Sequence, residues 1–155
     1  MVYLILFLSA FGASTLLPIY SEAVLLYDLS KGYPPLLLWL VATIGNTLGS
    51  ILNYYLGLKG EDFLERKGYL PKEKMMRYRK LFEKYGGWIL LMSWMPVIGD
   101  PLTFIAGVLR YDFRRFVLIV FFAKGIRYAF LIWLSNYYLP DIDFVKSIVN
   151  IFVKM

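Results

Sequence analysis

Four ionisable side chains lie within otherwise apolar stretches of this 155-residue chain, and their types suit the binding of a charged ligand. Two are carboxylates and two are cations: Glu22, Asp100, Lys124 and Arg127. Because Lys124 and Arg127 are three positions apart, a helix would present both on one face. An arginine can hold a phosphate through two parallel hydrogen bonds, and a lysine adds a point charge. With the amide of Asn46, these residues predict a substrate- or ion-binding site for a phosphate-bearing molecule.

The same residues could also bind protons, or could serve only to hold helices together. A carboxylate pair flanked by cations can take up or release protons, because burial and neighbouring charges shift its protonation equilibrium. Alternatively, Glu22–Lys124 or Asp100–Arg127 would be buried ion pairs that fix the packing. Asn46 would then only bond across helices. Both interpretations stay open at the level of the sequence.

Composition defines the class of protein that carries these residues. The chain is 59% hydrophobic and 19% aromatic, its mean hydropathy is +0.59, and several apolar runs approach the ~20 residues that span a bilayer. We therefore expect an all-α integral membrane protein with one domain over residues 1–155. The absence of Cys and His removes thiol chemistry and the usual zinc ligands, so no metal or cofactor is expected. The net charge of +6 is confined to short segments between apolar runs, which argues against a nucleic-acid partner.

The stretch 92–107 does not suit a plain transmembrane helix. It contains two prolines, two glycines and a carboxylate: Pro96, Gly99, Asp100, Pro101 and Gly107. Proline removes a backbone donor, and an ionised aspartate at membrane depth costs about 2.5–3.5 kcal/mol. Broken backbone at that depth requires burial in protein or a water-filled cavity. We interpret 88–109 as a re-entrant hairpin with Pro96 to Pro101 at its tip; the alternative is one kinked spanning helix.

Two runs are expected to span the membrane, and one polar segment to lie on its surface. Residues 36–57 form the first spanning helix, whose Gly45 and Gly49 make a GxxxG motif that lets another helix approach closely. Residues 116–139 form the second. Between them, 72–84 predicts a basic amphipathic surface helix that ends at the Gly86–Gly87 pair. The tail 141–155 is expected at the interface.

An internal repeat appears when the chain is shifted by 78 residues without a gap. Pro18 then falls on Pro96, Glu22 on Asp100, and Asn46 on Lys124. The first apolar region, 2–29, is accordingly a second hairpin, broken at Pro18. The alternative is a chance coincidence, since few identities support the repeat.

These elements make two inverted repeats, each a re-entrant helical hairpin followed by a transmembrane helix. Repeat one covers about 1–58, a cytoplasmic basic linker 59–87, and repeat two about 88–140. If the two hairpins meet, Glu22 and Asp100 come close together, and Asn46 and Asn53 face the same cavity.

Charge distribution favours this arrangement over four full spans. Residues 58–87 contain nine Lys/Arg against five Asp/Glu, and residues 110–115 contain three against one. If both hairpins are re-entrant, these two segments lie on the same side of the membrane, whereas two full spans would place them on opposite sides. The positive-inside rule then makes both segments cytoplasmic, with the two termini outside, and it gives the halves opposite orientations.

Four segments carry a resemblance to a known family. They are Leu16-Leu17-Pro18-x-x-Ser21-Glu22, Gly45-Asn46-x-x-Gly49-x-x-x-Asn53-Tyr54-x-x-Gly57, Phe82-x-x-Tyr85-Gly86, and Trp94-x-Pro96 through Gly107. The chain resembles the DedA family, whose domain is also called the VTT or SNARE-associated Golgi protein domain, and in particular its small YqaA-type branch. The resemblance implies two facing re-entrant hairpins and the movement of lipids, including polyprenyl-phosphate carriers, across the membrane.

One departure from the family pattern affects the site. Larger members carry arginines three residues before and three after the hairpin proline, where this chain has Ser93 and Gly99. The phosphate-binding role of those arginines does not carry over to these positions. Lys124 and Arg127 are the candidates to replace them.

We therefore expect a lipid translocase or scramblase-like transporter, multi-pass in a prokaryotic plasma membrane. Its partners would be membrane lipids, a polyprenyl phosphate or a phospholipid, with protons as a coupling ion; a homo-oligomer is compatible with the sequence. The alternatives are an ion or small-solute transporter and a non-catalytic structural or assembly protein. An enzyme is not expected, because the chain shows neither a phosphate-binding Gly-rich loop nor a nucleophile–base pair.

Overall fold

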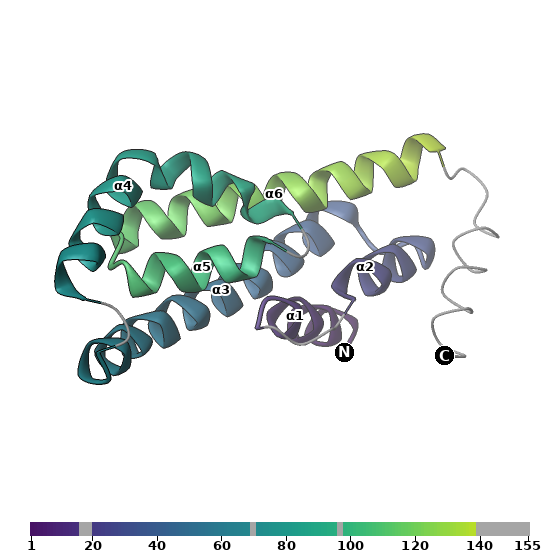
Figure 1. Cartoon of the computed structure of the whole chain (residues 1–155). Helices are drawn as coiled ribbons and strands as arrows, with labels where there is room; N and C mark the ends of the chain where they lie inside the picture. Colours follow the sequence, from purple (N-terminus) through teal and green to yellow (C-terminus); the bar gives the residue numbers. More distant parts are fainter. Residues whose placement is uncertain (16–19, 69–70, 96–97, 139–155) are drawn as a thin grey trace.

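The computed structural model describes residues 1–15, 20–68, 71–95 and 98–138, and all secondary structure in them is helical (Figure 1). The elements are α1 (Val2–Ala13), α2 (Ser21–Ser30), α3 (Pro35–Arg66), α4 (Lys72–Leu91), the short 3-10 helix η1 (Met92–Trp94), α5 (Gly99–Val108) and α6 (Phe113–Tyr138). The all-α prediction is confirmed. Pro18, Pro96 and the tail 141–155 lie outside the described residues.

Two of the described helices, α3 and α6, are long and apolar enough to cross a membrane. Helix α3 has 32 residues, so at 1.5 Å per residue it is roughly 48 Å long, well beyond a hydrocarbon core of about 30 Å. It begins at Pro35, a residue tolerated in a first helical turn, and it continues past the predicted end at residue 57. The extension from Lys59 to Arg66 contains no proline and ends in good helix formers, which explains why the helix does not stop.

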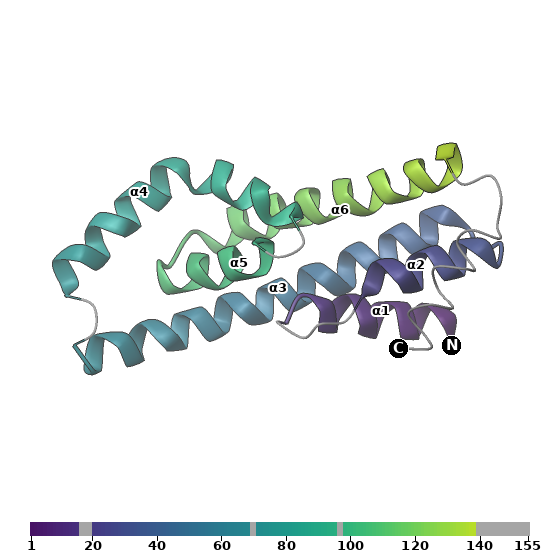
Figure 2. The ribbon, with the colours of Figure 1, turned by 45° about the vertical axis from the view of Figure 1, so that its right-hand side comes forward.

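Three other helices are too short to span. Helix α1 has 12 residues, and α2 and α5 have 10 each, which gives lengths of about 15–18 Å. Each belongs to a pair in which the chain turns back: α1 with α2, and the end of α4 with α5 (Figures 1 and 2). The break in helix predicted within 88–109 is therefore present, whereas re-entry into the bilayer stays a prediction.

The boundaries of the second pair differ from the sequence prediction in two respects. Helix α4 runs through Gly86 and Gly87 instead of ending there. A Cβ at Gly86 would overlap the rings of Phe82 and Tyr111, so this glycine serves close packing within a continuous helix. Pro101, predicted at the hairpin tip, is the third residue of α5, where a proline costs no helical hydrogen bond.

Helix α3 is the central element, and glycines bring two short helices against it. A Cβ at Gly45 or Gly49 would overlap backbone of α1, at the carbonyl groups of Phe7 and Phe11. On the other half of α3, Gly57 packs against α5, where a Cβ at Gly107 would overlap the carbonyl of Tyr54. Both short helices run in the same direction as α3, and both contacts follow the small-residue rule for helices in membranes.

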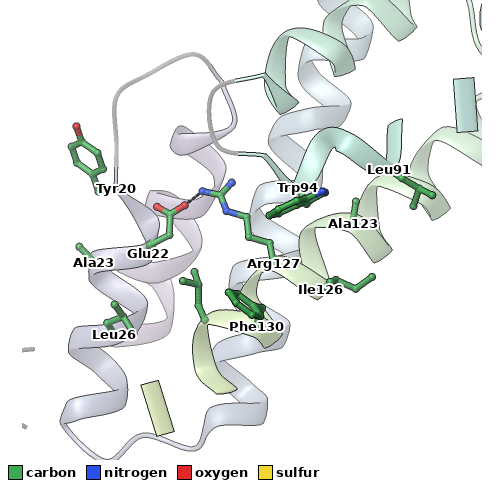
Figure 3. A pocket seen from close by; sticks show the side chains of 11 residues that line it. Tyr20, Glu22, Ala23, Leu26, Leu91, Trp94, Ala123, Ile126, Arg127 and Phe130 are labelled. Atoms are coloured by element: carbon green, nitrogen blue, oxygen red, sulfur yellow. Dashed lines mark ion pairs between the residues drawn. The ribbon is translucent and has the colours of Figure 1, made fainter. Parts of the chain in front are cut away.

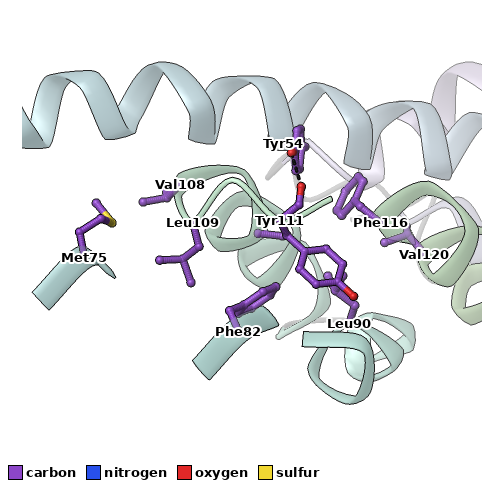
Figure 4. Close-up of a cluster of buried hydrophobic side chains, with 10 residues drawn as sticks. Tyr54, Met75, Phe82, Leu90, Val108, Leu109, Tyr111, Phe116 and Val120 are labelled. Carbon is purple, nitrogen blue, oxygen red and sulfur yellow. Dashed lines mark hydrogen bonds between the residues drawn. The ribbon is translucent and has the colours of Figure 1, made fainter. Parts of the chain in front are cut away.

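The apolar interior is divided into two clusters, one in each half of the molecule. The first lies among α3, α4, α5 and α6 (Figure 4) and consists of Tyr54, Met75, Phe82, Leu90, Ala106, Val108, Leu109, Tyr111, Phe116 and Val120. The second lies among α1, α2, α3 and α6 and consists of Leu6, Ala10, Leu25, Leu38, Ala42 and Tyr128. Each half of the chain thus forms a core with help from the other half.

The two basic segments lie at the same end of the bundle. Glu61 of α3, only 5% exposed, accepts a hydrogen bond from Arg79 of α4 at 2.6 Å and another from Arg110 in the α5–α6 turn. The bond and the charge of Glu61 raise the pKa of the Arg110 guanidinium, which keeps it charged. This cluster ties the linker and the turn 110–115 together on one side of the molecule.

Candidate functional site

An apolar cavity of about 880 Å³ lies in the described part of the chain (Figure 3). Its walls come from the start of α2, the end of α4 with η1, and the middle of α6. The lining residues are Tyr20, Glu22, Ala23, Leu26, Leu91, Trp94, Ala123, Ile126, Arg127, Phe130 and Leu131. Ile126, Phe130 and Trp94 are each at least half exposed, so the cavity opens at the outer surface of the bundle.

One ion pair crosses this apolar cavity. Glu22 of α2 and Arg127 of α6 point toward each other from opposite walls (Figure 3), and they form a salt bridge in which the side chains are 25% and 13% exposed. Glu22 lies in the first turn of α2, where a helix favours a negative charge. A charged pair that is open to a ligand therefore lies in a surface that is otherwise mostly apolar.

The second pair of predicted site residues lies away from the cavity. The ammonium group of Lys124 donates to Asp100 at 2.8 Å, and the two side chains are 0% and 11% exposed. The structure thus separates the four charges into Glu22–Arg127 and Asp100–Lys124, and the pairings Glu22–Lys124 and Asp100–Arg127 were wrong. The reason is geometric: side chains three apart on a helix diverge by about 60°, which directs Lys124 to α5 and Arg127 to α2.

A buried tyrosine that sequence reasoning missed links the two halves. The hydroxyl of Tyr128, which is 0% exposed, lies 2.9 Å from Ser21 Oγ and accepts a hydrogen bond from the amide of Asn46 at 2.9 Å. This hydroxyl connects α2, α3 and α6 next to Arg127. The sequence places Tyr128 one helical turn after Lys124, which could have indicated that it faces the interior. The chain has 13 tyrosines, however, and nothing else in the sequence distinguishes this one.

The two asparagines do not face the cavity, contrary to the prediction. Asn46 is 2% exposed and binds Tyr128. Asn53, also 2% exposed, donates to the carbonyl of Ser14 at 2.5 Å and to the hydroxyl of Thr103 at 3.2 Å. Both amides join helices in the packed interior, because the inner face of α3 is covered by α1, α5 and α6.

The positions where larger family members carry arginines have no room for long side chains. Ser93 is fully buried, and a Cβ at Gly99 would overlap the carbonyl of Ser93. The close approach of Ser93 to the start of α5 thus requires glycine at 99. In this chain Arg127, on α6, is the arginine that lines the cavity.

An all-helical bundle with two membrane-length helices, internal ion pairs and a lateral apolar cavity defines a helical membrane protein. The sequence model of the VTT domain matches residues 3–137, and the chain belongs to this family, also called DedA. The family identified from the four motifs is confirmed.

The relatives agree with this class. Inner membrane protein YqaA of Escherichia coli is 40% identical over 125 residues, which cover 80% of this chain and 84% of that protein. An uncharacterized protein of Haemophilus influenzae is 35% identical over 150 residues, covering 86% and 87%. A protein of Methanocaldococcus jannaschii is 26% identical over 132 residues, covering 84% and 81%. No solved structure gives a significant match.

Proposed function

We propose that this protein moves a phosphate-bearing lipid across the membrane and that Arg127 binds the head group. The observation that carries the proposal is the Glu22–Arg127 pair in the wall of an apolar cavity that opens at the bundle surface. A lipid has the same division into a charged head and hydrocarbon chains. Phe130, Ile126 and Leu26 would contact the chains, and the guanidinium fork would take the phosphate.

Glu22 couples the binding of the head group to the binding of a proton. In the free protein its carboxylate occupies the guanidinium of Arg127. A phosphate that takes this place leaves Glu22 without its counter-charge, and a carboxylate in that position favours the protonated form. Head-group binding is thereby coupled to the uptake of one proton, and release of the lipid restores the ion pair.

The same proposal includes the membrane arrangement. The hairpins α1–α2 and α4–α5 enter and leave on one side each, and α3 and α6 cross the bilayer, which makes two inverted repeats in a multi-pass protein. Two features support it: α1, α2 and α5 are too short to cross, and Glu61 joins the two basic segments at one end of the molecule. By the positive-inside rule this end is cytoplasmic.

Cysteine labelling tests the arrangement directly, because the natural chain has no cysteine. Lys67→Cys, at the end of α3, and Arg114→Cys, at the start of α6, are both exposed. A membrane-impermeant maleimide should label both only from the cytoplasmic side. Lys31→Cys, at the opposite end of α3, should be labelled only from outside. Labelling of positions 67 and 114 from opposite sides would exclude re-entrant hairpins.

Filling the cavity tests the lipid site. Ala23 lies on the α2 wall, and Ala23→Leu places three further carbons inside without touching the ion pair. We expect flux of a fluorescent phospholipid in proteoliposomes to fall at least about tenfold, the effect of 1.4 kcal/mol of lost binding. Ala129→Leu, exposed on α6 outside the cavity, is the matched control and should leave flux unchanged. Equal flux in both variants would place the lipid path elsewhere, or would favour a solute transporter.

A further inference from the structure

One carboxyl group outside the cavity is buried without a counter-charge. Asp28 of α2 is 4% exposed, and its Oδ2 atom has no hydrogen-bond partner. The other carboxylates that are buried or line the cavity each have a cation: Glu22 has Arg127, Asp100 has Lys124, and Glu61 has Arg79 and Arg110. Among the described residues, Asp28 is the exception.

The elements packed against α2 offer no cation for Asp28 in the described part of the chain. Helix α2 contacts α1, α3 and α6. Helix α1 has no charged side chain, and α3 has none before Lys59. Met1, just before α1, is fully exposed, so its amino group lies in water and not in the interior beside Asp28. On α6, Lys124 and Arg127 are both paired with other carboxylates. Lys31, just after α2, lies over the ring of Tyr27 instead, 5.3 Å from its centre.

Three tyrosines on or next to the helices packed against α2 are also titratable, and their contacts lie away from the Asp28 carboxyl. Tyr3 of α1 and Tyr33 form an edge-to-face ring contact at 5.9 Å. The backbone N–H of Tyr33 donates to the carbonyl of Asp28, not to its carboxyl. The hydroxyl of Tyr128 is engaged with Ser21 and Asn46.

Asp28 lies on the interior face of α2. The buried residues of this helix are Ser21, Leu25 and Asp28, whose spacing of four and then three places them on one stripe. The stripe begins at Ser21, which contacts Tyr128, and continues through Leu25, which belongs to the second apolar cluster among α1, α2, α3 and α6. The cavity is lined by other positions of the same helix, Glu22 and Ala23 among them.

We propose that Asp28 is a proton-binding site, whose carboxyl carries a proton at neutral pH and exchanges it with water at the end of α2 beside Lys31. An ionised carboxylate without a partner in an apolar interior is strongly unfavourable, and the group neutralises by binding a proton. The bound proton keeps α2 packed against α1 and α3.

A consequence of this site, which rests on the proposed function, is control of the lipid cavity. Loss of the proton would leave an unpaired charge on the interior face of α2, and the charge is relieved only when α2 moves toward water. Because α2 also carries the Glu22 wall, that movement changes the cavity. Protonation of Asp28 from the side of Lys31 would therefore determine whether the α2 wall of the lipid cavity stays in place.

Infrared spectroscopy tests the bound proton on the purified full chain. At neutral pH the wild-type protein should show the C=O stretching band of a protonated carboxyl, and Asp28→Asn should lose it. Asparagine has the shape of the neutral acid, so the fold should be retained. Asp62→Asn, which removes an exposed aspartate at the other end of α3, is the matched control and should leave the band intact. A band that survives in folded Asp28→Asn protein would overturn the proposal.

A measurement on unmodified protein covers the case in which Asp28→Asn does not fold. Aspartate labelled with ¹³C in the carboxyl group distinguishes neutral from ionised side chains by solid-state NMR. We expect a neutral aspartate signal at neutral pH. If all six aspartates are ionised, Asp28 does not hold a proton.

Flux assays separate this proposal from the lipid site itself. Asp28→Asn should still transport lipid, but its flux should depend less on the pH on the side of Lys31 than wild-type flux does, because only the proton uptake at Glu22 remains. An absence of flux in the wild-type protein would refute the proposed function while leaving the infrared result valid. Wild-type pH dependence in Asp28→Asn would refute the control of the cavity by Asp28.

Discussion

Replacing Arg127 with alanine should abolish lipid flux in a protein that stays folded. Charged hydrogen bonds are worth about 1.5–3 kcal/mol each, and the guanidinium offers two to a phosphate. Their loss reduces flux by two orders of magnitude or more. The fold should tolerate the change because Glu22, 25% exposed at the cavity wall, can be hydrated when its partner is removed.

The conservative variant sharpens this test. Arg127→Lys keeps the charge but lacks the planar fork, so it should restore flux only in part. Arg114→Ala removes an exposed arginine in the first turn of α6 and serves as the control, with wild-type flux and melting temperature. Flux at the wild-type level in folded Arg127→Ala protein would remove the head-group site from this cavity.

The outline of the fold could be predicted from the sequence because its signals are local. Apolar runs of membrane length located α3 and α6, and the combination of proline, glycine and aspartate near Asp100 located a break in helix. The GxxxG pair in α3 lies where α1 packs closely. Each of these signals depends on a few neighbouring residues, which a single sequence contains.

The details of the site could not be predicted, because they depend on which helix faces which. The four charges were recognised, but their pairing depends on the rotation of α6, which directs Lys124 and Arg127 to different neighbours. Asp28 gave no signal, since its burial results from the docking of α2 on α1 and α3. The predicted helix end at Gly86 was wrong for a related reason. Packing of Gly86 against Tyr111, and not local helix propensity, keeps α4 helical there.

The second large effect concerns stability, and it falls on the other ion pair. Lys124→Met leaves the interior Asp100 without the cation that it pairs with, and breaking a buried pair in this way costs about 3–5 kcal/mol. Lys124 is fully buried and is not among the residues that line the cavity described above, so water cannot compensate as it can at Arg127. We expect a large fall in melting temperature in detergent, far beyond that of Arg127→Ala.

Exchange of both partners distinguishes a packing role from a binding role for this pair. The double variant Asp100→Leu/Lys124→Met removes both charges and keeps apolar volume, and such exchanges of buried pairs are often neutral or stabilising. Its melting temperature should return to near the wild-type value, with lipid flux retained, because the head group binds at Arg127. A stable double variant without flux would instead place Asp100 and Lys124 on the path of the lipid or of the coupled proton.

A single Lys124→Met variant that melts like the wild type would mean that Asp100 is already neutral or hydrated. The contrast between a pair whose loss removes stability and a pair whose loss removes transport follows from exposure alone: one lies in the packed interior, and the other lies in the wall of a cavity.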